Sequence, residues 1–282
     1  MIVVVLRLAL TTIWLIDAPE GATLPADPSA LAVDAVGSVY VAGSQPSGIW
    51  KLDPSGTVEV VHLAEGPYGT PLRAIRALTI DEAGTLFAAD SATGDVYRLR
   101  PEGPPEPLTA GALEVPTGLL VEPEGSILVC DQRLGRIVRL PNGGGVPEPI
   151  AEVAAPRGLA RHPAGGIVVL SIREEALLHV KLDASEPPRA LVLGHPFGLP
   201  NAILDDPESG GFLVSDGYAA TIWMVSPEGA IQARYQGKPM VRPSALARDQ
   251  TGALLIADPG AGQVFRAEES GALKPLLKGE RP

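Results

Sequence analysis

The only cysteine of the chain lies in a group of residues that could carry out thiol chemistry. Cys130 is followed directly by Asp131, and Arg133 and Arg136 come shortly afterwards, in the stretch ILVCDQRLGR. A thiol becomes a nucleophile when nearby cations favour its thiolate form. A carboxylate beside the sulfur has the opposite effect, because it raises the pKa of the thiol. The role of this stretch depends on whether it is a single site or one copy of a repeat.

A short phrase, usually opened by proline and closed by leucine or isoleucine, recurs along the chain. Its copies are PSAL (28–31), IRAL (75–78), PTGL (116–119), PRGL (156–159), PNAI (200–203) and PSAL (243–246). Their last residues are 47, 41, 40, 44 and 43 positions apart. Each phrase is followed by a glycine, an apolar run, a gap and a second apolar run, and a weaker, more polar run closes most units.

Each unit therefore reads as four short strands joined by tight turns, with the most polar strand at the exposed edge. A repeat of about 40–45 residues with four strands is typical of a β-propeller blade. The sequence predicts an all-β fold, a six-bladed β-propeller of four-stranded antiparallel blades, over residues 25–282. A propeller of seven blades, with an incomplete N-terminal blade, is the alternative.

Alignment of the repeats gives the cysteine stretch a structural interpretation. Cys130 occupies a column of small or apolar residues at the end of an inner strand, with Ala42, Ala89, Leu170, Ser215 and Ala257. A buried free cysteine behaves as such a residue. Asp131 shares the next column with Asp90, Asp216 and Asp258, where a carboxylate can accept hydrogen bonds from the amides of the following turn. Blades one and four have Gly43 and Ser171 in this column.

Composition excludes several classes of function. The 282 residues are 45% hydrophobic, with 32 glycines and 29 prolines, which suits many short strands and turns. A net charge of −11 disfavours nucleic acid and anionic membranes as partners. The histidines fall at different repeat positions without metal-ligand spacing: His62, His162, His179 and His195.

The repeat resembles the NHL repeat and the related six-bladed propellers of the SMP-30, gluconolactonase and strictosidine-synthase-like group, over residues 28–278. The resemblance implies that ligands bind at the mouth of the central channel, which the second residue of each phrase faces. These residues are Ser29, Arg76, Thr117, Arg157, Asn201 and Ser244. Two arginines among four neutral hydrogen-bonding groups favour an anion, unless the arginines pair with nearby carboxylates.

Loops next to the phrases add further candidates at the predicted mouth. They supply the cationic or titratable residues Arg73, His195, Lys238 and Arg242, the apolar residues Tyr68 and Phe197, and the acids Glu114 and Glu152. The predicted ligand-binding set is Ser29, Arg76, Thr117, Arg157, His195, Asn201, Arg242 and Ser244. The expected function is non-catalytic: a binding or scaffold module, without a cofactor, for a small anionic ligand or an acidic peptide or protein partner.

The alternative is a divalent-metal-dependent lactonase or hydrolase, because lactonase-like members of the group hold a cation such as Ca²⁺ in the channel. Asn201 matches their asparagine ligand, whereas Ser244 stands where an aspartate is expected. The only acid near the first phrase is Asp27, and the two channel arginines would repel a cation. We therefore expect no catalytic residues and no complete metal site.

The N-terminal segment, residues 1–24, has two interpretations. Its apolar start, MIVVVLRLALTTIWLI, is compatible with a secretory signal peptide, which would place the protein outside the cytoplasm. However, TIWLIDAPEGA (12–22) closely matches TIWMVSPEGA (221–230) and could instead be part of a blade, in which case the protein could be cytoplasmic. In either case we expect a monomer.

Overall fold

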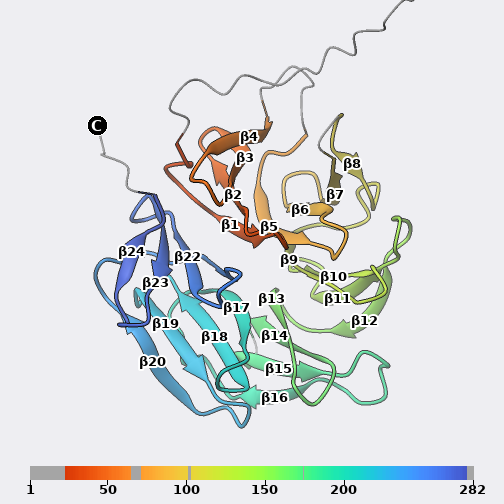
Figure 1. Cartoon of the computed structure of the whole chain (residues 1–282). Coiled ribbons are helices and arrows are strands. Elements are labelled where there is room, and N and C mark those ends of the chain that lie inside the picture. Colours follow the sequence, from red (N-terminus) through yellow and green to blue (C-terminus); the bar gives the residue numbers. More distant parts are fainter. Residues whose placement is uncertain (1–22, 65–70, 101–102, 174, 278–282) are drawn as a thin grey trace, which may run out of the picture.

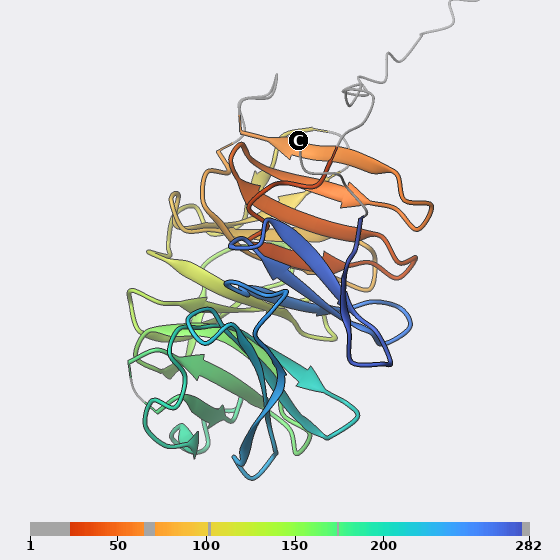
Figure 2. The same ribbon diagram turned by 90° about the vertical axis from the view of Figure 1, so that its left-hand side faces the viewer.

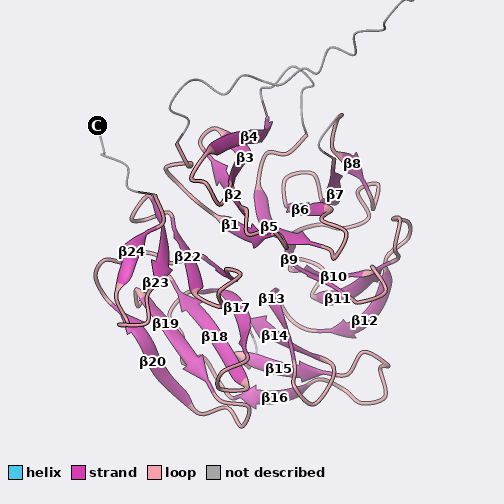
Figure 3. Ribbon diagram, viewed as in Figure 1, coloured by secondary structure: helices cyan, strands magenta, loops and turns pink. Residues whose placement is uncertain are grey.

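The computed structural model describes residues 23–64, 71–100, 103–173 and 175–277. Its strands form six four-stranded antiparallel sheets that stand around a central axis, as Figures 1 and 2 show. The predicted six-bladed β-propeller is confirmed. Figure 3 shows strands and loops only, and within the described residues no helix is long and apolar enough to span a membrane. The two interpretations of residues 1–24 stay predictions, because residues 1–22 lie outside the described part.

Each blade is made of four strands that are consecutive in the chain. The innermost strands are β1 (Ala30–Val33), β5 (Ile75–Ile80), β9 (Pro116–Val121), β13 (Pro156–Arg161), β17 (Pro200–Asp206) and β21 (Ala245–Arg248). The second strands are β2 (Val39–Ser44), β6 (Leu86–Asp90), β10 (Ile127–Asp131), β14 (Ile167–Ser171), β18 (Gly211–Asp216) and β22 (Leu254–Asp258). The third strands are β3 (Ser47–Leu52), β7 (Asp95–Leu99), β11 (Arg136–Leu140), β15 (Leu177–Val180), β19 (Thr221–Val225) and β23 (Gln263–Ala267). The outermost strands are β4 (Val58–Leu63), β8 (Glu106–Pro107), β12 (Glu148–Glu152), β16 (Arg189–Val192), β20 (Ile231–Gln236) and β24 (Leu273–Pro275).

The hydrophobic core is divided among the boundaries between neighbouring blades. Leu78 of the second blade, for example, packs with Ala42 and Ile49 of the first. The ring closes in the same way, since Leu31 of the first blade packs with Ala247 and Leu255 of the sixth. Because no strand passes from one blade to another among the described residues, side-chain packing and hydrogen bonds between neighbouring blades hold the ring together.

The aspartate column connects the loops of the channel mouth to the blades. The Asp216 carboxylate accepts hydrogen bonds from the amides of Gly198 (2.7 Å) and Leu199 (2.9 Å), in the loop that enters β17. It also accepts bonds from the amides of Tyr218 and Ala219 in the following turn, which confirms the turn-stabilising interpretation. Asp90, Asp131 and Asp258 bond the equivalent loops and turns. In these four blades the aspartate thus fixes the loop that leads into the innermost strand.

The two blades without this aspartate join their turn to the entering loop by other hydrogen bonds. In the first blade the carboxylate comes from the entering loop, where Asp27 accepts hydrogen bonds from the Ser44 hydroxyl and from the amides of Ser44 and Gln45. Gly43 leaves room for this arrangement, because a Cβ there would lie 2.5 Å from the Pro25 side chain. In the fourth blade the Ser171 hydroxyl donates to the Ala154 carbonyl at 2.7 Å.

Candidate functional site

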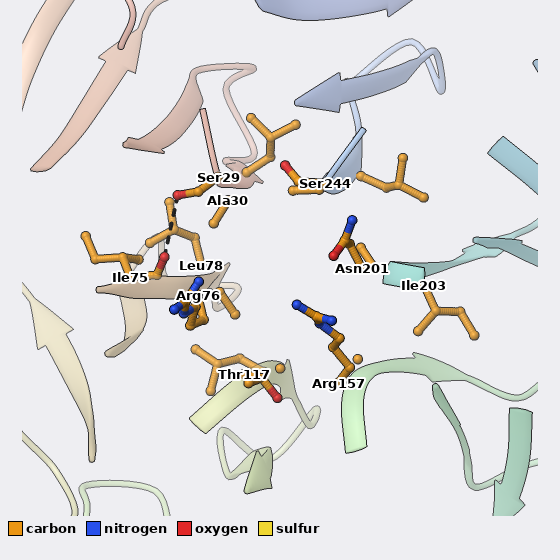
Figure 4. Close-up of a pocket in the computed structure, with 18 of the residues that line it drawn as sticks. Ser29, Ala30, Ile75, Arg76, Leu78, Thr117, Arg157, Asn201, Ile203 and Ser244 are labelled. Carbon is orange, nitrogen blue, oxygen red and sulfur yellow. Dashed lines mark hydrogen bonds between the residues drawn. The ribbon is translucent and has the colours of Figure 1, made fainter. Parts of the chain in front are cut away.

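The second residue of each repeated phrase lines one cavity in the central channel. The cavity has a volume of about 490 Å³, within the range of small-molecule sites. Figure 4 shows these six side chains around the opening, with Arg157 and Asn201 reaching toward its middle. Arg242, from the loop that enters β21, also lines the cavity. Seven of the eight predicted ligand-binding residues are therefore brought together.

β-Bulges explain why several of these side chains face the channel. In the fourth blade Pro156 pairs with Ser171 and Gly158 with Leu170, which leaves Arg157 as an extra residue without a partner. The same register shift falls at Arg76 in the second blade, Thr117 in the third and Asn201 in the fifth. A bulge re-aims the side chain of its extra residue. Here it breaks the alternation of the innermost strand at the phrase's second position.

The four neutral residues of the ring connect neighbouring blades. Each donates a side-chain hydrogen bond to the carbonyl oxygen of the first phrase residue in the next blade. The bonds are Ser29 Oγ to Ile75 (3.5 Å), Thr117 Oγ1 to Pro156 (3.0 Å), Asn201 Nδ2 to Pro243 (3.1 Å) and Ser244 Oγ to Pro28 (3.3 Å). These residues therefore have a structural role at the mouth, and their oxygens can still accept hydrogen bonds.

The two arginines of the ring do not take part in these bonds between blades. Arg76 donates from Nε to the Ser91 hydroxyl of its own blade at 3.0 Å. The guanidinium of Arg157 makes no hydrogen bond or ion pair with any residue that the structure describes, although the residue is half-buried. Burial, and to a smaller extent the charge of Arg76, lowers the pKa of Arg157 from its ordinary value. Arg157 is thus a partly desolvated cation without a protein counter-ion among the described residues.

Carboxylates do not compensate this charge inside the cavity. Among the described residues its lining contains Arg76, Arg157 and Arg242, but neither an aspartate nor a glutamate. Glu114, which the sequence places near the mouth, pairs instead with Arg133 at 2.7 Å. Glu152 is exposed and does not line the cavity. The channel is therefore basic in a protein whose net charge is −11.

His195 and Phe197 lie outside the channel cavity. Both line a second cavity of about 250 Å³, between the turn that follows β14 and the loop that enters β17. Arg73 and Lys238 are exposed and line neither cavity. Tyr68 lies outside the described residues.

Gln132 is a channel residue that the sequence analysis did not identify. It directly follows Asp131, at the position that Ser91 takes in the second blade. The Ser91 hydroxyl bonds Arg76 at the channel mouth. The position directly after a column aspartate is therefore close to the channel, and its alignment across the repeats is the signal that could have identified Gln132.

The channel does not fit a divalent cation. Such an ion needs several oxygen ligands, usually including carboxylates. Among the described residues no group of three or more histidine, cysteine, aspartate or glutamate side chains could hold a metal. Of the three ligand positions considered from the sequence, Asn201 lines the channel as an oxygen donor of the expected type, Ser244 stands in place of an aspartate, and the Asp27 carboxylate is engaged with the turn at Ser44. The neighbouring guanidinium groups oppose a cation further, so no catalytic step through a metal follows from this channel.

Cys130 is a core residue. It is fully buried, and its sulfur would lie 3.2 Å from a Cβ placed at Gly118 on the neighbouring inner strand. Burial and the charge of Asp131 raise the pKa of the thiol well above its ordinary value. These features agree with the buried, structural role that the repeat column predicts for Cys130, and the central channel is the candidate functional site.

The fold and the channel define a six-bladed β-propeller with a basic central cavity. No protein-family model matches the chain, and no curated protein matches it. Solved structures with a similar fold include virginiamycin B lyase from Staphylococcus aureus, at 15% identity and a TM-score of 0.66, where the match covers 90% of this chain and 86% of the lyase.

Two further structures show how varied the proteins with this fold are. A gluconolactonase from Xanthomonas campestris is 20% identical with a TM-score of 0.63, over 84% of this chain and 86% of that protein. An auxiliary nutrient binding protein from Bacteroides ovatus is 15% identical with a TM-score of 0.68, over 86% of this chain and 69% of that one. Likenesses at these identities show a common fold, on which sites of different function are built.

Proposed function

We propose that the protein is a binding propeller that recognises a small anionic ligand, or an acidic group of a partner peptide, at the mouth of its central channel. The observation that carries this proposal is Arg157, a half-buried cation without an ion-pair partner among the described residues. Arg76 and Arg242 line the same cavity, and no carboxylate does so in the described part of the chain.

The physical argument is that a desolvated cation gains more from a ligand than an exposed one. Bringing Arg157 into the channel has already cost part of its hydration, and the charge of Arg76 adds repulsion. A carboxylate or phosphate would offset both effects, because a guanidinium can donate two parallel hydrogen bonds to such a group. The three arginines of the lining make the channel a local basic region, within a chain of net charge −11, that attracts anions.

Thermal unfolding with acetate and with phosphate tests the proposal. A ligand that binds only the folded state raises the unfolding temperature, so we expect both anions to stabilise the wild-type protein. The double variant Arg76→Ala/Arg157→Ala should lose this stabilisation. Arg73→Ala is the matched control, because it removes an exposed arginine that does not line the cavity, and it should respond like the wild type. Equal stabilisation of the double variant would refute the proposal.

Metal-dependent hydrolysis, the alternative, has a separate test. Calorimetric titration with Ca²⁺, Mn²⁺ and Zn²⁺ measures whether the channel binds a divalent cation. Because the channel lining lacks carboxylates among the described residues, we expect no binding in the micromolar range. Tight binding that disappears in Asn201→Ala would favour the hydrolase over the anion-binding module.

A further inference from the structure

The boundary between the fourth and fifth blades departs from the pattern of the ring in two ways. The column position holds Ser171 instead of an aspartate, and its hydroxyl, rather than a carboxylate from this position, bonds the entering loop at the Ala154 carbonyl. In addition, residue 157 is an arginine, which like Arg76 makes no bond to the next blade within the described residues, whereas the neutral ring residues bond the carbonyl of the following blade.

A cavity of about 250 Å³ lies at this same boundary. Its walls are mainly apolar, from Ile172 and Ala176 of the fourth blade and Phe197, Leu199 and Pro200 of the fifth. His195 is the only titratable side chain in the lining, within the residues described. An apolar cavity of about 150 Å³ is large enough to take benzene, so this one has room for an aromatic ring or a branched aliphatic group.

The cavity adjoins the basic channel. Leu199 lines both spaces, so the two are separated by little more than one side chain. Ser171, which lines the smaller cavity, pairs across the sheet with Pro156, the residue directly before Arg157. A single small molecule could therefore reach the guanidinium of Arg157 with one end and the apolar walls with the other.

We infer that the cavity between the fourth and fifth blades is an apolar subsite of the anion site, and that the ligand is a monocarboxylate that carries a compact apolar group. This inference rests on the proposed function, because the carboxylate binds Arg157. The apolar group gives the site selectivity against small inorganic anions, which can use the arginines alone. Burial of a phenyl-sized group should increase affinity between about tenfold and a hundredfold over acetate.

The experiment is calorimetric titration with acetate, phenylacetate, 3-phenylpropanoate and 4-phenylbutanoate. The series varies the distance between the carboxylate and the ring, and at least one aryl acid should bind ten- to a hundredfold more tightly than acetate. Ala176→Leu fills the cavity and should reduce the affinity for that acid to the level of acetate, with acetate binding unchanged. Ile172→Trp is a second filling variant at a half-buried position, for use if the first does not fold.

The outcomes separate this inference from the proposed function. If acetate binds through Arg157 but every aryl acid binds with the same affinity, the subsite is refuted and the anion site stands. A folded Ala176→Leu variant that keeps the full aryl gain also overturns the subsite, because the ring must then lie elsewhere. If neither these acids nor phosphate binds at all, the proposed function itself fails.

Discussion

Asp216 offers a direct test of how the channel mouth is held in place. Its carboxylate is fully buried, and one oxygen, Oδ2, accepts bonds from the Gly198 amide at 2.7 Å and the Trp223 indole at 3.2 Å. In Asp216→Asn an amide nitrogen replaces one oxygen, so two donors lose their acceptor and face another donor. A buried donor left unsatisfied costs about 1–3 kcal/mol, which gives a predicted destabilisation of about 2–6 kcal/mol.

Guanidinium chloride unfolding of the wild type and the variant measures this loss. A domain is stable by about 5–15 kcal/mol, so the predicted change would move the midpoint far down the denaturant scale. Asp205→Asn is the matched control, because this half-buried carboxylate on the neighbouring strand of the same blade, β17, makes no side-chain hydrogen bond or ion pair with the described residues. We expect its effect to stay within about 0.5 kcal/mol. Similar midpoints for the two variants would show that the aspartate column does not hold the mouth.

Two further predictions concern protonation and thiol chemistry. Burial acts to raise the pKa of Asp216, but hydrogen bonds from the amides of Leu199 and Gly198 outweigh it, so the pKa is lowered. The contribution of Asp216 to the free energy of unfolding is therefore complete above the unfolded carboxyl pKa of about 3.9 and is lost as the pH falls through the pKa of the folded state. Stability should decrease below about pH 4, and Asp216→Asn should make this decrease smaller. Burial raises the pKa of Cys130, so a disulfide reagent should not label the native protein at neutral pH but should label it fully in denaturant; rapid native labelling would contradict the buried position.

The fold was predictable because every blade repeats the same local rules. The phrase at the start of each inner strand and the glycine turns recur every 40–47 residues, and four of the six blades have the column aspartate, so six copies of one weak pattern gave one strong prediction. The interpretation of Cys130 followed from the same alignment. This interpretation needed no knowledge of three-dimensional contacts, because the small or apolar residues of the column indicate a buried position.

The site was predictable only in part, because it depends on contacts between blades. Alignment put Ser29, Thr117, Asn201 and Ser244 in one column, and the resemblance to known propellers implied that this column faces the mouth. Neither showed that these side chains bond the carbonyl of the next blade. These bonds join residues of neighbouring repeats, and no spacing within one repeat predicts them. His195 lies in a loop between repeats, where the pattern gives no register, and the structure places it at the smaller cavity.

The construction of each blade from one continuous chain segment has a consequence for how such a ring can change. A whole blade could be duplicated, deleted or exchanged by a single cut at each end, because no strand would have to be shared with a neighbour. The new boundary would need a matching apolar surface, and a neutral side chain at the phrase's second position would add a hydrogen bond to the next carbonyl. The boundaries where arginine occupies that position, after the second and fourth blades, lack this bond among the described residues, so exchange of a blade there would not have to restore it.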